Sequence, residues 1–167
     1  PYSFTKWQGE QLCEMYSKVY DLPVTICRFY NVYGPHQLTE GDYCTVLGIF
    51  ESLYKNSKPL TITGDGEQRR DFTHVEDIVD GLIKCHNMNN QYTWPPANSF
   101  NQFELGRGKN YSINEIADAF GDGYPRRYID EWRGEMRDTL CTDTKAKDLL
   151  SWKPTRDVIE YIKETNG

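Results

Sequence analysis

A tyrosine and a lysine at helical spacing, Tyr2 and Lys6, are the first residues that could do chemistry. On a helix, side chains four residues apart lie one turn apart on the same face. A lysine ammonium beside a phenol favours the phenolate, so it lowers the pKa of the tyrosine and makes it a usable base near neutral pH. Tyr54 and Lys58 share this spacing, so the spacing alone is weak support for a catalytic pair.

Two arginines follow a glycine turn in the segment 64–77. The planar guanidinium group suits bidentate binding of phosphate oxygens, so Arg70 is a candidate anion ligand, and a surface pair with an aspartate is the alternative. Arg137 is either a second phosphate contact or an exposed charge. His74 has no second histidine or cysteine at metal-ligand spacing. We therefore expect it to pack and to hydrogen-bond locally, and we predict no metal site.

The string 28–35 is polar and aromatic, and it lies where a β-branched strand at 24–29 runs into a loop. Ligands of open α/β sheets bind at the carboxyl ends of strands, so this string is well placed to contact one. A plain strand followed by a turn would give the same pattern.

Hydrophobic periodicity, capping residues and prolines predict the elements that position these residues. We expect helices at 3–20, 46–54, 76–88, 112–120, 144–150 and 155–164. We expect strands at 24–29, 60–63, 101–105 and 126–129, and loops at 31–42 and 87–99. Ser3 is the expected cap of the first helix, and Ser112 with Glu115 forms a predicted capping box. Helices alternating with buried strands predict an α/β sheet.

Composition excludes several classes of function. The chain has 25 acidic and 19 basic residues and a net charge of −6, which argues against a nucleic-acid-binding protein. Its apolar and charged fractions, 38% and 26%, are typical of a soluble globular protein. No apolar run approaches the roughly 18 residues that cross a bilayer. Five scattered cysteines without a C-x-x-C pair predict reduced thiols and a cytoplasmic protein.

Four segments in this order resemble those of the extended short-chain dehydrogenase/reductases that act on nucleotide-diphosphate sugars. Residues 1–6 are similar to P-Y-x-x-[ST]-K and residues 28–35 to R-[FY]-x-N-V-[YF]-G-P. Residues 60–77 are similar to L-x-I-x-G-D-G-x-Q-x-R-D-F-x-x-V-x-D, and residues 134–154 to G-[DE]-x-R…K-A-x-x-L-L-G-W-x-P. Together they cover essentially the whole chain, and four ordered motifs are far more specific than one.

The resemblance implies an α/β fold: the C-terminal part of an NAD(P)-binding, Rossmann-like enzyme with a small mixed α/β substrate-binding domain. Residues 1–33 would be a remnant of the cofactor domain, with the catalytic helix and the strand after it. Residues 34–167 would form the substrate-binding domain, and 101–106 would return to the cofactor sheet. The chain opens at Pro1 without a methionine, so we expect a piece of a longer protein.

The resemblance also implies roles for single residues. Tyr2 would be the acid/base, Lys6 would hold the nicotinamide ribose of NAD, and Phe29 would lie near the nicotinamide. The implied contacts to the nucleotide-diphosphate sugar are Asn31, Arg70 and Arg137 at the diphosphate, with Thr45, Val46, Thr61 and Thr63 lining the base.

The implied activity is that of a UDP-glucose 4-epimerase-like isomerase; a 4,6-dehydratase of the same family and a non-catalytic sugar-nucleotide-binding module are the alternatives. In the family, the G-x-x-G-x-x-G loop and the catalytic Ser/Thr precede the tyrosine segment, and neither is present here. We therefore expect the chain alone to be inactive and to bind NAD weakly or not at all. Exposed apolar surface around residues 1–30 would favour pairing with a second copy or with a missing N-terminal half.

Overall fold

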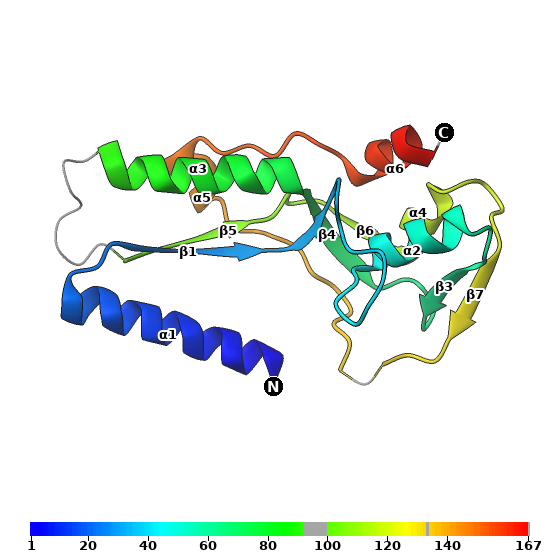
Figure 1. Ribbon diagram of the computed structural model, residues 1–167, viewed down its shortest axis with the longest axis horizontal. Coiled ribbons are helices and arrows are strands. Elements are labelled where there is room, and N and C mark those ends of the chain that lie inside the picture. Colours follow the sequence, from blue (N-terminus) through cyan, green and yellow to red (C-terminus); the bar gives the residue numbers. More distant parts are fainter. Residues whose placement is uncertain (92–99, 133, 167) are drawn as a thin grey trace. The chain divides into compact units, whose positions relative to one another are not determined.

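Helices and strands alternate along the chain in the computed structural model, which describes residues 1–91, 100–132 and 134–166 (Figure 1). The helices are α1 (Tyr2–Tyr20), α2 (Val46–Lys55), α3 (Val75–Gln91), α4 (Ile113–Asp118), α5 (Lys145–Leu150) and α6 (Val158–Asn166). The strands are β1 (Val24–Phe29), β2 (Asn31–Tyr33), β3 (Leu60–Thr63), β4 (Arg69–His74), β5 (Phe100–Leu105), β6 (Asn110–Ser112) and β7 (Arg126–Ile129). The fold is mixed α/β, as the sequence predicts.

The chain forms two compact units, each assembled from segments that are far apart in the sequence. The first unit contains Pro1–Arg28, Val79–Leu105 and Asp143–Trp152. The second contains Phe29–Ile78, Gly106–Thr142 and Lys153–Gly167. The division into a cofactor remnant at 1–33 and a substrate domain at 34–167 stays a prediction.

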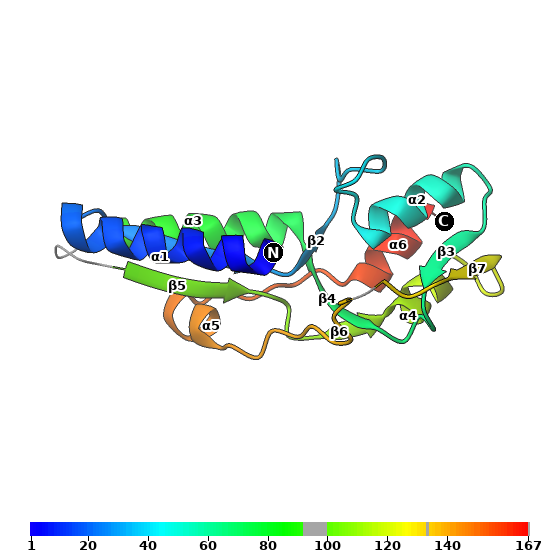
Figure 2. The ribbon, with the colours of Figure 1, turned by 90° about the horizontal axis from the view of Figure 1, so that it is seen from below.

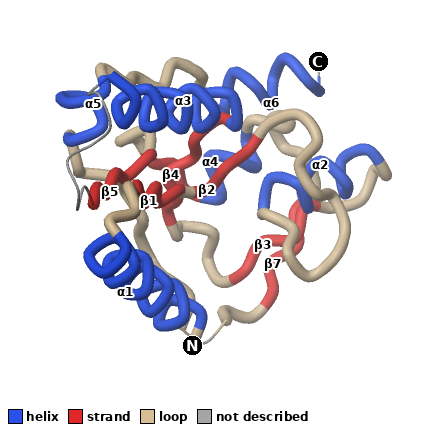
Figure 3. Tube along the Cα trace, turned by 60° about the vertical axis from the view of Figure 1, so that its left-hand side comes forward, coloured by secondary structure: helices blue, strands red, loops and turns tan. Residues whose placement is uncertain are grey.

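The first unit is built around β1 and β5, which form a two-stranded sheet between helices α1 and α3 (Figures 1 and 3). Helix α5 packs beside β5 (Figure 2). Leu105 on β5 and Trp152 after α5 are buried. An added Cβ at Gly81 of α3 would lie 2.8 Å from Leu105 Cδ1, so glycine allows the close approach of this helix to its neighbours.

Helix α1 presents much of its apolar surface to solvent. Ser17 is its one buried residue among those the structure describes, and Tyr2 and Trp7 are 73% and 52% exposed. The other exposed large apolar side chains of this helix are Phe4, Leu12, Met15, Tyr16, Val19 and Tyr20. An amphipathic helix usually buries its apolar stripe, and the described part of the chain leaves these side chains of α1 exposed.

The second unit is organised by β4. This strand pairs in parallel with β2, placing Asn31 opposite Phe72, and antiparallel with β6, placing Arg70 opposite Tyr111. A separate parallel pair joins β3 to β7. Helices α2 and α4 pack against β3. Arg70 therefore lies on a strand paired with β6 rather than on a surface loop.

Aromatic and branched side chains fill the core of the second unit. Leu47 and Phe50 of α2, Ile62 of β3 and Phe72 of β4 are at most 1% exposed. Tyr33, Leu60, Tyr111, Ile113, Ile116, Ala117, Phe120, Val158 and Ile162 complete the cluster. Burial of this size is the main favourable contribution to the folding of a small unit.

Most predicted elements are confirmed. The strands at 24–29, 60–63 and 126–129 have their predicted bounds, and the Ser112–Glu115 capping box is present. Strands β2, β4 and β6 were missed: β2 and β6 have only three residues each, and all three strands pair with partners distant in sequence. The loop prediction at 87–99 is wrong for 87–91, which continue α3, and 92–99 lie outside the described residues. Ser3 does not cap α1, whose N-cap is Pro1.

His74 packs in this core, as the sequence predicts. Its ring lies 5.2 Å from that of Tyr33 and 5.7 Å from that of Tyr161, and its Nδ1 accepts a hydrogen bond from the Glu76 N–H at 3.2 Å. Burial lowers the pKa of His74 below its usual 6.5, and the charge of Arg156 lowers it further, against the opposing effects of Glu76 and Asp77. Burial in the folded state therefore favours the neutral imidazole.

We expect the free energy of unfolding to fall as the pH drops below about 6.5, the ordinary pKa of histidine. The unfolded chain takes up a proton at His74 at a higher pH than the folded chain does, so protonation favours unfolding. Denaturant titrations between pH 7.5 and 5 measure the slope. His74→Phe should lose this contribution and the exposed-site variant His36→Asn should keep it; equal slopes in wild type and His74→Phe would contradict the assignment.

Candidate functional site

Six predicted substrate residues line one cavity of about 420 Å³ in the second unit. They come from four separate segments: Asn31 begins β2, Thr45 and Val46 begin α2, Thr61 and Thr63 lie on β3, and Arg70 lies on β4. Cys44, Gln68, Ile113, Trp132 and Glu135 complete the lining. A cavity of this volume, with a few polar groups among apolar ones, is typical of small-molecule sites.

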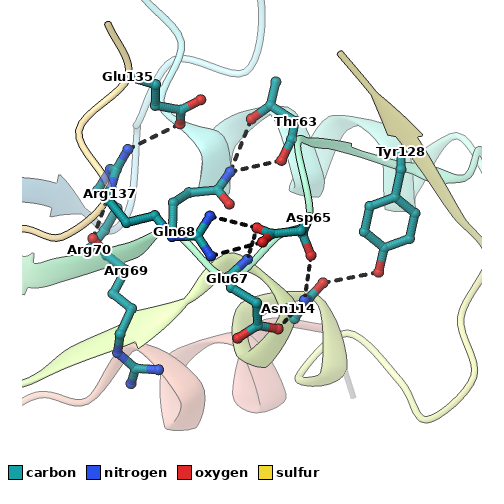
Figure 4. A network of polar contacts seen from close by, with 10 residues as sticks. All are labelled: Thr63, Asp65, Glu67, Gln68, Arg69, Arg70, Asn114, Tyr128, Glu135 and Arg137. Atoms are coloured by element: carbon teal, nitrogen blue, oxygen red, sulfur yellow. Dashed lines mark hydrogen bonds and ion pairs between the residues drawn. The ribbon is translucent and has the colours of Figure 1, made fainter. Parts of the chain in front are cut away.

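Arg70 supplies a positive charge to this cavity. Its side chain is 13% exposed; Nη1 donates to the Arg69 carbonyl at 2.8 Å, and Nη2 donates to Glu135 Oε1 at 3.0 Å (Figure 4). The sequence left open a surface pair of this arginine with an aspartate. That alternative is wrong, because the partner of Arg70 is a glutamate, Glu135. These two contacts fix the guanidinium plane, so its remaining N–H groups are oriented before any ligand arrives.

Gln68 fixes the position of Thr63. Its side chain is 5% exposed, and Nε2 donates to the Thr63 carbonyl at 3.0 Å and to Thr63 Oγ1 at 3.1 Å (Figure 4). One amide therefore ties the end of β3 to the start of β4 across the turn at Gly64 and Gly66. Both glycines have positive φ, +59° and +76°, a conformation that other residues rarely adopt. The predicted turn is confirmed.

Arg137 lies outside the lining of this cavity and pairs with Asp65 on the same turn. Nη1 and Nη2 donate to the two carboxylate oxygens of Asp65 at 2.7 and 2.8 Å (Figure 4). This bidentate bond and the Glu67 N–H hold the pKa of Asp65 at about 2. Asn114 donates to the Asp65 carbonyl at 3.0 Å and accepts from Tyr128 at 3.0 Å. The structure thus places Arg137 in a bracing network next to the cavity.

Asp71, beside Arg70 on β4, is a buried acceptor for three backbone donors. It is fully buried, and its carboxylate accepts from the N–H groups of Arg107, Gly108 and Cys141 at 2.9 to 3.0 Å. These donors belong to two other loops of the second unit. One carboxylate therefore joins both loops to the strand that carries Arg70.

The two predicted residues on α2 are positioned by the start of that helix. Thr45 is its N-cap, and its Oγ1 accepts from the Gly48 N–H at 3.3 Å. Gly48 lies against the chain before the helix: an added Cβ would lie 2.0 Å from the Leu38 carbonyl oxygen. Close packing of α2 on this segment therefore needs a residue without a side chain.

Gly48→Ala is expected to lower the free energy of unfolding by about 1–3 kcal/mol, because the methyl group must displace backbone atoms in a packed region. Gly9→Ala on α1 is the matched control. An added Cβ there meets nothing within 4 Å, so alanine should be neutral or stabilising in that helix. Chemical denaturation of both variants measures the difference, and equal stability of the two variants would contradict this account of α2.

The predicted catalytic pair lies on α1 with the spacing that a helix gives. Lys6 Nζ lies 5.4 Å from the centre of the Tyr2 ring, and both side chains are exposed. Phe29 ends β1 and is 48% exposed. Tyr54 and Lys58 do not form a comparable pair, since α2 ends at Lys55.

The cavity contains residues that the sequence did not identify. Gln68 and Glu135 lie inside segments that resemble the family, and Cys44 is next to the predicted Thr45. All three could therefore have been identified from their sequence neighbours. Trp132 is 70% exposed and had no such signal. Ile113 reaches the cavity only because β6 pairs with β4, a contact between distant segments.

The residues that the structure describes contain no group of three or more histidine, cysteine, aspartate or glutamate side chains that could hold a metal ion. In the same part of the chain, none of the helices combines the length and the apolar character that crossing a bilayer requires.

Comparisons with known proteins point to one family. The model of the NAD dependent epimerase/dehydratase family matches residues 1–95. A UDP-glucuronate 4-epimerase of Thermodesulfobacterium geofontis is 32% identical over 170 residues, which cover 99% of this chain and 49% of that protein. The chain spans about half the length of the curated relatives it matches.

Solved structures agree with this result. The UDP-glucose 4-epimerase of Thermotoga maritima with UDP-glucose superimposes with a TM-score of 0.84 at 28% identity, covering 99% of this chain and 52% of that one. The UDP-glucuronic acid 4-epimerase of Bacillus cereus, in complex with UDP-glucuronic acid and NAD, gives 0.79 at 29% identity, with shares of 99% and 53%. That this chain corresponds to the C-terminal part of such an enzyme stays a prediction.

Proposed function

Because the chain belongs to the NAD dependent epimerase/dehydratase family, we propose that it is the sugar-nucleotide-binding portion of a nucleotide-diphosphate-sugar 4-epimerase. The observation that carries the proposal is the cavity of about 420 Å³ that six predicted substrate residues share. These residues come from segments up to 39 positions apart, Asn31 to Arg70, and the family resemblance implies a substrate contact for each of them. The 4-epimerases of Thermotoga maritima and Bacillus cereus support this reaction over a 4,6-dehydration.

The diphosphate of the substrate is recognised by Arg70 and Asn31. The Arg70 guanidinium is oriented by its bonds to the Arg69 carbonyl and to Glu135, so little conformational freedom is lost when a phosphate binds. Charge-assisted hydrogen bonds of this kind are among the stronger polar contacts in proteins. Thr61 and Thr63 supply neutral polar groups to the same cavity and are suited to the nucleoside.

The reaction requires a proton to leave the 4-hydroxyl of the sugar and to return. Tyr2 is the group that we assign to this transfer, and Lys6 would hold the nicotinamide ribose. A bound NAD would supply the hydride-transfer chemistry. Tyr2 and Lys6 fit this role because both are exposed and lie on one face of α1, so a ribose can reach them.

The proposed function also requires a partner for this chain. Its 167 residues contain no G-x-x-G-x-x-G segment, so we expect neither turnover nor tight NAD binding by this chain alone. Its partner would be a second copy or the remaining half of the enzyme. The exposed apolar side chains of α1 support this expectation, because a partner would bury them. A cytoplasmic location is part of the same proposal.

Calorimetric titration of the 167-residue chain without NAD tests the function. UDP-, GDP- and dTDP-sugars are compared with NAD and with free glucose under identical conditions. We expect at least one sugar nucleotide to bind, and we expect glucose to give no heat because it lacks the diphosphate. A folded chain that binds NAD tightly and no sugar nucleotide would refute the proposal.

A further inference from the structure

We infer that Cys27 and Cys85 form a reversible disulfide bond that links strand β1 to helix α3. Their thiols lie in contact, with 3.6 Å between the two Sγ atoms. Both residues belong to the first unit, so the distance is set within one compact body. The two cysteines are 58 positions apart in the sequence, and no motif of the sequence analysis includes either of them.

The geometry favours this pair over the other thiols. Joined sulfur atoms lie about 2.05 Å apart, so the two Sγ atoms must approach by roughly 1.5 Å. Side-chain rotation and a small movement of α3 against β1 can supply such a shift. Cys13 is exposed on α1, and the Cys44 thiol donates to the Leu38 carbonyl at 2.9 Å. Cys141 lies in the second unit.

The two thiols differ in a way that suits a two-step exchange. Cys27 is half-buried, whereas Cys85 is 4% exposed. The contact with Cys85 lowers the pKa of Cys27, and the same contact together with burial raises the pKa of Cys85. The thiolate is the reactive form of cysteine, so Cys27 is the nucleophile and Cys85 resolves the mixed disulfide.

The oxidant is a low-molecular-weight disulfide, such as oxidised glutathione. The Cys27 thiolate attacks one sulfur, its bond to glutathione forms, and the first glutathione leaves as a thiolate. Cys85 then loses its proton and attacks Sγ of Cys27, and the second glutathione leaves. Two thiols are oxidised to one disulfide while one molecule of oxidised glutathione is reduced to two of glutathione. Excess thiol reverses both steps.

The test compares folded and unfolded chain by peptide mapping. The 167-residue chain is incubated with oxidised glutathione, remaining thiols are alkylated in acid, and trypsin is added. The five cysteines fall on five different tryptic peptides. We expect the folded chain to give mainly peptide 19–28 joined to peptide 85–107. In concentrated guanidinium chloride, random pairing should reduce this product to roughly a tenth of all linked pairs, with variation from loop length.

Cysteine-to-serine variants show which two cysteines form the disulfide bond. Cys27→Ser and Cys85→Ser should abolish the linked product, and Cys85→Ser should retain glutathione on Cys27; Cys44→Ser should behave as the wild type. The proposal is overturned if the folded chain gives the same product distribution as the unfolded chain, or if Cys27 keeps glutathione in the wild type. The comparison of folded with unfolded wild type decides the matter even if a variant does not fold.

Discussion

Replacing Arg70 by alanine is expected to weaken binding of the best sugar nucleotide by about 10- to 100-fold. Hydrogen bonds to charged groups contribute about 1.5–3 kcal/mol each, and about 1.4 kcal/mol corresponds to a factor of ten. Arg70 lines the cavity, and Glu135 and the Arg69 carbonyl already orient its guanidinium. The loss should be smaller for Arg70→Lys, which keeps the charge without the planar fork. Isothermal titration calorimetry with the ligand found for the wild type measures it.

Arg127→Ala is the matched control, because it removes the same side chain from an exposed position on β7. Its affinity should equal that of the wild type. A second comparison separates binding from folding: all three variants should retain the circular dichroism spectrum of the wild type. Equal affinity in Arg70→Ala and Arg127→Ala, with both chains folded, would exclude Arg70 as the diphosphate contact.

Asp71→Ala is expected to lower the free energy of unfolding by about 3–5 kcal/mol. The substitution leaves the N–H groups of Gly108 and Cys141 without their acceptor, and the Arg107 N–H keeps only its contact with Thr73 Oγ1 at 3.1 Å. A hydrogen bond to a carboxylate contributes about 1.5–3 kcal/mol, so losing these contacts together accounts for the expected decrease. Because stability of a small domain is about 5–15 kcal/mol, the variant should be close to unfolding at room temperature.

Urea denaturation followed by tryptophan fluorescence measures the effect. Asp71→Asn keeps one carbonyl acceptor and should be intermediate, and Asp122→Ala in an exposed turn should change stability by less than about 0.5 kcal/mol. If Asp71→Ala unfolded at the same urea concentration as Asp122→Ala, the carboxylate would not be the junction of the two loops.

Local patterns were sufficient to predict the elements whose signals are contained in their own residues. The strand at 60–63 alternates buried and half-buried side chains and follows a proline, and the helix after Ser112 carries its own capping box. Strands β2 and β6 have three residues each. Their extended conformation depends on pairing with β4, so nothing in three residues distinguishes them from loop.

The site shows the same difference between local patterns, which can be predicted, and contacts between distant segments, which cannot. Asn31, Thr61 and Arg70 were predicted from ordered family segments, and the structure brings them to one cavity. The ion pair of Arg70 with Glu135 could not be predicted, because it joins positions 65 residues apart. Likewise the place of Arg137 follows from its bond to Asp65, which the spacing of the arginines does not encode.

The central claim is that the cavity lined by Asn31, Thr61, Thr63 and Arg70 binds the sugar nucleotide. Nuclear magnetic resonance of the isotope-labelled chain, titrated with UDP-, GDP- and dTDP-sugars in the absence of NAD, tests it residue by residue. We expect the largest amide shifts at these four residues, together with a shift of the Trp132 indole N–H. Shifts confined to other parts of the chain, or a folded chain that responds to none of these ligands, would contradict it.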